Sequence, residues 1–102
     1  MTTAVRSHND VEAAYTAAQK VVETHHRIAA FLHEGLTLAQ IDRFVFETLE
    51  ELGCKSCFFK YRAGGLPPFP SQACLSVNDC VVHGPAAYRL EPLNAGDVLK
   101  ID

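Results

Sequence analysis

The stretch FPSQACLSVNDCVVHG, residues 69–84, decides most of what can be predicted about this chain's fold. It contains two short apolar runs, residues 73–77 and 80–82, separated by an Asn-Asp pair of the kind found in tight turns. Apolar runs of this length between turn residues are typical of β-strands. The stretch therefore predicts two strands joined as a hairpin, although neither turn residue is glycine.

Upstream of this stretch, apolar residues recur at helical spacing across residues 11–32. This pattern predicts one amphipathic helix of several turns. Asn9 and Glu12 have the spacing of a capping box, so we expect them to begin the helix, and Gly35 to end it.

A second helix is predicted directly afterwards. Thr37 and Gln40 repeat the capping-box spacing, apolar residues follow at helical intervals from Ile41 to Leu52, and Gly53 is placed to close the helix. Downstream, residues 57–59 and 97–102 read as further strands. Helices first and strands second predict an α+β fold, formed by residues 1–102 as a single domain.

Composition and charge exclude several classes of function. The net charge is −3 and the basic residues are scattered, which argues against a nucleic-acid partner or an anionic membrane surface. No apolar stretch is long enough to span a membrane, and residues 1–8 lack the apolar core of a secretory signal. We therefore expect a cytoplasmic protein whose four cysteines are free thiols.

Two residues are candidates for catalysis or metal binding. His83 could exchange protons near neutral pH, and the glycine after it lets a substrate or another backbone approach closely. Asp102 places a carboxylate on an otherwise apolar predicted strand, where it is costly to bury unless it is paired or binds a metal. One carboxylate cannot anchor a catalytic metal, which normally takes three or more protein ligands.

The cysteines and the remaining histidines give weaker indications. Cys54 and Cys57 have C-x-x-C spacing, but Cys74 and Cys80 do not repeat it, so a double-knuckle zinc pattern is absent. The C-x-x-C pair also follows a predicted helix end, where the dipole disfavours a thiolate. The favoured interpretation is that the cysteines serve as small buried apolar residues. The other histidines lack metal-binding helical spacing and predict a solvated helix face: His25, His26 and His33.

Taken together, three segments resemble the type I methionine aminopeptidase family. Residues 69–84 resemble its F/Y-P-x-S-x-C-x-S-x-N-E-x-V-x-H-G pattern, and GDVLKID, residues 96–102, resembles its G-D-[IV]-[VL]-x-I-D. GLTLAQID, residues 35–42, resembles its G-V-x-T-x-E-I-D helix start. The resemblance implies the N-terminal half of a pita-bread fold. It also implies removal of N-terminal methionine from new proteins, with two divalent metal ions (Mn, Fe, Co or Zn) in the complete enzyme.

The resemblance assigns roles to individual residues. Asp102 matches the first metal-binding aspartate, and His83 matches the catalytic histidine that contacts the substrate near the scissile bond. The positions that match the pocket for the methionine side chain are Tyr61, Phe69 and Cys74. The positions that match a monovalent-cation site are Asn78 and the carbonyl of Cys80. The chain departs from the family pattern in a longer loop between Tyr61 and Phe69 and in the lack of a residue between Pro70 and Ser71.

Three hypotheses follow. The first is the N-terminal portion of a methionine aminopeptidase, inactive alone and binding no divalent metal tightly because the other ligands would lie beyond residue 102. Such a piece is expected to associate with its missing half or with itself, since strand edges would be uncovered. The second is a non-catalytic module of the same fold that binds peptides or partners. The third is a redox or zinc protein built on Cys54 and Cys57.

Overall fold

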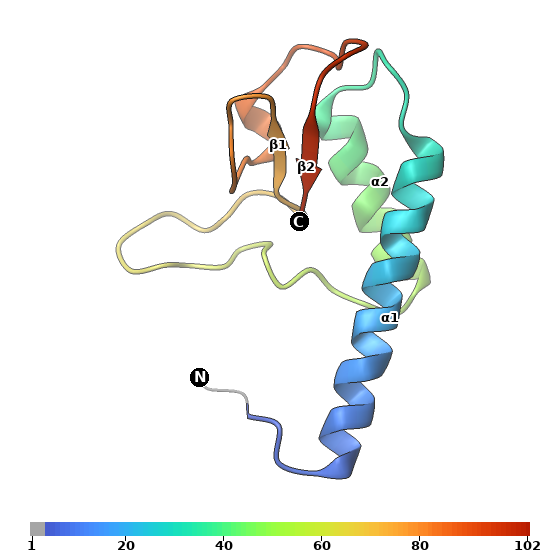
Figure 1. The fold of residues 1–102 in the computed structure, drawn as a ribbon. Coiled ribbons are helices and arrows are strands. Elements are labelled where there is room, and N and C mark those ends of the chain that lie inside the picture. The colour runs from blue at the N-terminus through green and yellow to red at the C-terminus, as the bar shows by residue number, and fades with distance from the viewer. Residues whose placement is uncertain (1–3) are drawn as a thin grey trace.

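A computed structural model describes residues 4–102 and contains two helices followed by a small antiparallel sheet (Figure 1). The elements in chain order are α1 (His8–Phe31), α2 (Leu38–Glu51), β1 (Leu75–Val77), the 3₁₀ helix η1 (Ala86–Tyr88) and β2 (Leu99–Ile101). This order confirms the predicted α+β class, with antiparallel strands after two helices. No helix in residues 4–102 has the length and apolar character needed to cross a membrane.

Helix α1 is present as predicted, but the residues at its ends differ from the prediction. Ser7 caps it: Ser7 Oγ accepts from the Asp10 backbone N–H at 3.1 Å, and the Asp10 carboxylate accepts from the Ser7 N–H at 3.1 Å. The predicted Asn9–Glu12 box is wrong because both residues already lie inside the helix. Leu32 adopts an extended conformation and ends the helix, so Gly35 belongs to the following turn.

Helix α2 begins and ends where its sequence predicts. The Thr37 hydroxyl accepts from the Gln40 backbone N–H at 3.2 Å, and the Gln40 amide oxygen accepts from the Thr37 N–H at 2.9 Å. Gly53 follows the last turn with a φ of 72°, a left-handed conformation that favours glycine. Both signals act over three or four residues, which is why the sequence alone predicts them.

The strand pairing differs from the predicted hairpin. β1 pairs with β2, in the register Leu75↔Ile101 and Val77↔Leu99, while residues 80–82 form no strand. The Asn78-Asp79 turn exists, but the chain beyond it leaves Val81 and Val82 exposed. Residues 57–59 also form bends and a turn rather than a strand.

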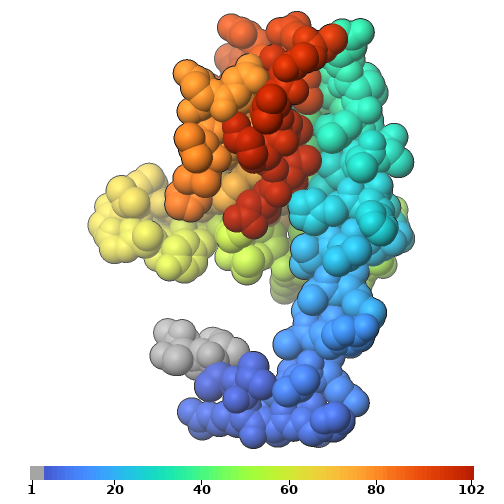
Figure 2. Space-filling view, viewed as in Figure 1, coloured from blue at the N-terminus to red at the C-terminus, as the bar shows by residue number. Residues whose placement is uncertain are grey.

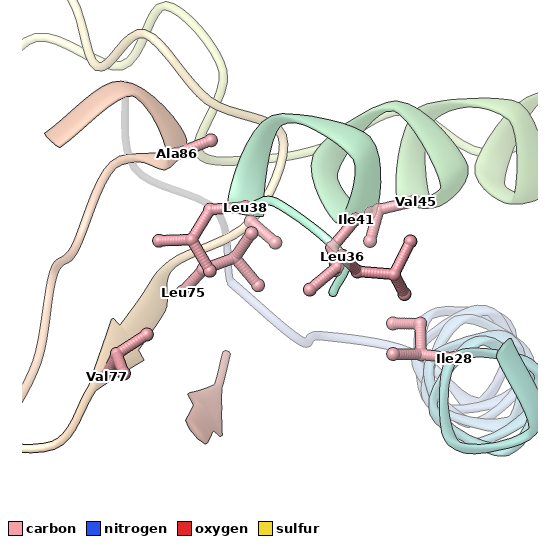
Figure 3. Close-up of a cluster of buried hydrophobic side chains, with 9 residues drawn as sticks. Ile28, Leu36, Leu38, Ile41, Val45, Leu75, Val77 and Ala86 are labelled. Carbon is pink, nitrogen blue, oxygen red and sulfur yellow. The ribbon is translucent and has the colours of Figure 1, made fainter. Parts of the chain in front are cut away.

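The hydrophobic core lies between the sheet and α2 (Figure 3). Leu38, Ile41 and Leu75 have almost no exposed surface, and Figure 3 shows Ile28 of α1 on the far side of the α2 side chains from Val77. Burial of each such side chain contributes about 1.5–3 kcal/mol. This core holds β1 and the loop that precedes it against α2.

The N-terminal half of α1 lies outside this core. It is the blue segment that extends below the rest of the molecule in Figure 2. Val11 and Val22 are each 53% exposed and Tyr15 is 64% exposed, although all three belong to the predicted apolar face. The sequence pattern therefore describes a helix whose apolar face is only partly covered by this chain.

Candidate functional site

A cavity of about 510 Å³ opens between the loop of residues 58–70, the segment 83–85 and the end of the β1–β2 pair. Five of the seven predicted site residues line it: Tyr61, Phe69, Cys74, His83 and Asp102. The other two, Asn78 and Cys80, do not. The fold thus brings together residues up to 41 positions apart in the sequence, and their grouping is the basis for calling the cavity a candidate site.

Cys74 and Asp102 face each other across the sheet. Their backbones exchange two hydrogen bonds, from Cys74 N–H to Asp102 O at 2.8 Å and from Asp102 N–H to Cys74 O at 3.0 Å. Directly opposed residues in an antiparallel pair present their side chains on the same face. Burial, followed by the negative charge of Asp102, raises the pKa of the Cys74 thiol. Cys74 is therefore a protonated, weakly polar part of the wall at neutral pH.

His83 reaches the cavity through an unusual backbone conformation. Its φ is 59°, in the left-handed region, and Gly84 immediately after it is tied to β1. The Gly84 carbonyl accepts from Leu75 N–H at 2.7 Å, and the Gly84 N–H donates to Ser76 Oγ at 3.0 Å. A Cβ on Gly84 would lie 2.9 Å from the Tyr88 ring and closer still to the Leu75 carbonyl. Only glycine fits there, and it fixes the direction from which His83 enters.

The far wall of the cavity is aromatic. The rings of Phe58 and Phe69 meet edge to face, with centroids 6.4 Å apart and an interplanar angle of 72°. Phe69 is also held by its backbone, because Lys60 N–H donates to Phe69 O and Phe69 N–H donates to Tyr61 O, both at 2.8 Å. These bonds close the base of the long loop seen in the sequence, which projects as the yellow lobe in Figures 1 and 2.

Asn78 connects the turn after β1 to the segment before β2. Its side-chain oxygen accepts from Val98 N–H at 2.9 Å, and its amide donates to Asp97 at 3.1 Å. Its carbonyl accepts from the Lys100 ammonium at 2.6 Å. The predicted monovalent-cation site at Asn78 and the carbonyl of Cys80 stays a prediction.

The residues around the cavity do not by themselves fit a pair of divalent metal ions. Asp102 is the only carboxylate among the lining residues, and residues 4–102 contain no group of three His, Cys, Asp or Glu side chains placed to hold a metal. Protein-bound catalytic metals normally take at least three protein ligands. Cys54 and Cys57 are free thiols, as are Cys74 and Cys80.

Several polar residues that support the cavity were not singled out by the sequence patterns. Ser71 Oγ accepts from Ala86 N–H at 2.7 Å and Ser76 Oγ holds Gly84, both from buried positions. Asp42 of α2 accepts hydrogen bonds from Gln72 and Ala73. One signal for Asp42 was present: it ends the GLTLAQID motif and directly follows the core residue Ile41.

Comparison with known proteins agrees with the motifs. Residues 12–102 match the family model described as metallopeptidase family M24. A methionine aminopeptidase of Aquifex aeolicus is 31% identical over 101 residues, which cover 94% of this chain and 37% of the relative. Those of Clostridium perfringens and Clostridium acetobutylicum are 29% and 32% identical, over 96% and 92% of this chain and 36% of each relative.

The chain therefore spans little more than a third of the length of these curated relatives. No solved structure matches it significantly.

Proposed function

The chain belongs to metallopeptidase family M24, and on that premise we propose that it forms the substrate-facing part of a methionine aminopeptidase-like hydrolase. The observation that carries this proposal is the cavity in which aromatic rings, a buried thiol, His83 and Asp102 meet. The substrate would be a peptide or a nascent protein with an N-terminal methionine, in the cytoplasm. Four free thiols agree with that reducing compartment.

The cavity suits the methionine side chain for a physical reason. An unbranched thioether is polarizable and adapts to irregular apolar space, and its sulfur makes favourable contacts with the edges of aromatic rings. Phe58 and Phe69 supply two such rings, and the protonated Cys74 adds a small apolar contact without a charge. An acidic side chain at the same position would lose its hydration and would meet the like charge of Asp102.

His83 and Asp102 supply the polar end of the site. A histidine held at the rim can donate a hydrogen bond to the carbonyl oxygen of the bond to be cleaved, where negative charge develops during hydrolysis. The metal ions of a metallopeptidase (Mn, Fe, Co or Zn) need more ligands than Asp102 provides. We therefore propose that hydrolysis requires additional polypeptide and that this chain alone is inactive.

A complementation assay tests the proposal. Met-Ala-Ser is incubated with this chain and each divalent metal, alone and together with the C-terminal two-thirds of a methionine aminopeptidase expressed separately. We expect no methionine release from the chain alone and metal-dependent release from the mixture. His83→Ala should abolish that release, whereas His26→Ala, on the exposed surface of α1, should not. Turnover by the chain alone would refute the assignment of inactivity.

A second candidate function is peptide binding without catalysis. One observation favours it: residues 58–102 form the whole cavity, and Asp102 is the only charged residue that lines it. A carboxylate beside an apolar pocket can pair with the α-ammonium group of a peptide whose first side chain fills the pocket. Calorimetry in the presence of EDTA separates the two functions. Binding of Met-Ala-Ser but not of its N-acetylated form, weakened by Asp102→Asn, would support the binding module.

A further inference from the structure

Asp42 has a charged side chain that the proposed chemistry does not use. It lies on α2, is half-buried, and does not line the cavity. One carboxylate oxygen accepts from the backbone N–H groups of Gln72 and Ala73, both at 3.0 Å, and the other accepts from Gln72 N–H at 3.0 Å. Hydrogen bonds to a charged acceptor are about twice as strong as those between neutral groups. Asp42 therefore attaches the segment before β1, which contains Gln72 and Ala73, to α2.

The same segment is held from its other side by Ser56. The Ser56 hydroxyl donates to the carbonyl of Gln72, so the backbone donor and acceptor of Gln72 are both taken by side chains. Ser56 Oγ in turn accepts from the N–H groups of Phe58 and Phe59 at 3.1 and 3.2 Å. The two side chains come from segments 30 and 16 residues before Gln72. Together they form a clamp, Asp42–Gln72–Ser56.

The clamp residues are close in sequence to both walls of the cavity. Phe58 is two residues after Ser56, Cys74 is two residues after Gln72, and Phe69 precedes Gln72 by three. All three line the cavity. We therefore expect a change in the position of Gln72 to shift the aromatic wall relative to the thiol wall. The negative charge of Asp42 is also one of the smaller causes, after burial, Asp102 and Cys57, that raise the pKa of Cys74.

We propose that Asp42 is a positioning residue, which acts through Gln72 and Ser56 to set the separation of the two walls of the cavity. The proposal rests on the proposed function only in treating this cavity as the substrate pocket. Asp42 would act without touching the peptide. Loosening it should open the pocket locally while the core around Ile41 and Leu75 stays folded.

Accessibility of Cys74 provides a test that requires no activity. The four cysteines are alkylated with N-ethylmaleimide at pH 8, and the rate at each is measured by peptide mass spectrometry. In the native chain we expect the buried Cys74 to react much more slowly than the exposed Cys57. Asp42→Asn should speed reaction at Cys74 by roughly tenfold or more, the factor expected when one charge-assisted hydrogen bond is lost from a local opening equilibrium. Reaction at Cys80, which follows the turn after β1, should change little.

Matched variants separate a clamp from general destabilisation. Glu47→Gln makes the same carboxylate-to-amide change at an exposed position of α2 and should leave the Cys74 rate unchanged. Ser56→Ala should reproduce the effect of Asp42→Asn. Ser56→Thr keeps the hydroxyl, so Cys74 should react as slowly in this variant as in the native chain. An unchanged Cys74 rate in either Asp42→Asn or Ser56→Ala, or an equal increase at all four cysteines, would overturn the proposal. The Ser56→Ala result is needed because removing the Asp42 charge also lowers the pKa of Cys74, which by itself speeds alkylation.

Titration with Met-Ala-Ser distinguishes this inference from the proposed function. If the native chain binds the peptide, Asp42→Asn should weaken binding several-fold, and Glu47→Gln should not. If the native chain binds no peptide while the alkylation pattern appears as described, the clamp stands and the assignment of the pocket to methionine fails. If peptide binding is seen but is unaffected by Asp42→Asn, the positioning role fails and the pocket assignment stands.

Discussion

At the residue scale, Gly84 shapes the cavity although it is not one of the residues that line it. Its neighbour His83 has a φ of 59°, and the Gly84 backbone bonds to Leu75 and Ser76 on β1. We expect Gly84→Ala to lower the free energy of unfolding by about 1–3 kcal/mol, because the added methyl group must displace the Tyr88 ring or the strand. Urea denaturation measures the loss.

Gly64→Ala is the control for this substitution. A Cβ at Gly64 meets no atom within 4 Å, and the residue does not have a positive φ. We expect its stability to equal that of the native chain within a few tenths of a kcal/mol. If Gly84→Ala were equally stable, with the NMR resonances of the His83 ring unchanged, then the close packing of Gly84 would have no role in placing the histidine.

At the scale of single elements, the two helix caps should differ in importance. Thr37 and Ser7 make equivalent capping boxes, but α2 is packed in the core whereas the first turns of α1 are exposed. Thr37→Ala should therefore lower the free energy of unfolding by about 1 kcal/mol. Ser7→Ala should cost less than roughly 0.5 kcal/mol, because an unpacked helix end frays before the molecule unfolds.

Urea denaturation with hydrogen exchange on α1 measures both effects. Equal losses of global stability in the two variants would mean that the N-terminal turns of α1 fold together with the core, contrary to their exposure.

The segment that connects η1 to β2 should be sensitive to acid. The Asn94 backbone N–H, the Asn78 amide and then Arg89 hold the pKa of Asp97 below its ordinary value. A lowered pKa means that this stabilisation is present above pH about 4, the ordinary range for aspartate, and is lost as the pH falls through the lowered value. Asp97→Asn should be less stable than the native chain at pH 7, and its stability should fall less between pH 6 and pH 3.

The control for the acid experiment is Asp79→Asn, an exposed carboxylate in the neighbouring turn. It should follow the pH dependence of the native chain. Thermal denaturation over the pH series makes the comparison, and a native-like pH profile for Asp97→Asn would show that this carboxylate does not couple the turn after β1 to β2.

At the scale of the whole molecule, the uncovered face of α1 should lead to association. Val11, Tyr15 and Val22 lie on one stripe of the helix by their spacing, and each is more than half exposed. We expect the isolated chain to form dimers or larger species with increasing concentration in sedimentation velocity experiments. Tyr15→Lys combined with Val22→Lys should reduce this association.

A charge-matched control places the same two lysines at Asn9 and Thr16, two exposed polar positions that lie away from the stripe on the same helix. This control should associate like the native chain. A native chain that remains monomeric across the concentration series would contradict the prediction, and equal effects of both double variants would assign the association to net charge rather than to the apolar stripe.

The sequence by itself determined the two helices and the caps of α2. Helices and capping boxes depend on bonds between residues three or four positions apart. The roles of Thr37, Gln40 and Gly53 at the ends of α2 can therefore be predicted from the local sequence. Five of the seven residues proposed from the sequence lie among the residues that line the cavity, while Asn78 and Cys80 do not, and the roles assigned to all seven stay predictions. The apolar stripe of α1 could be recognised as apolar, but its spacing contains no information about what covers it.

Only the tertiary structure decided which segments meet. A strand needs a partner for its backbone groups, and β1 finds it in β2, more than twenty residues later, instead of in the apolar run that follows its turn. The left-handed conformation of His83 and the hold of Asp42 on Gln72 likewise depend on groups distant in sequence. These choices follow from competition among all segments for the same core and the same backbone donors, which no local pattern expresses.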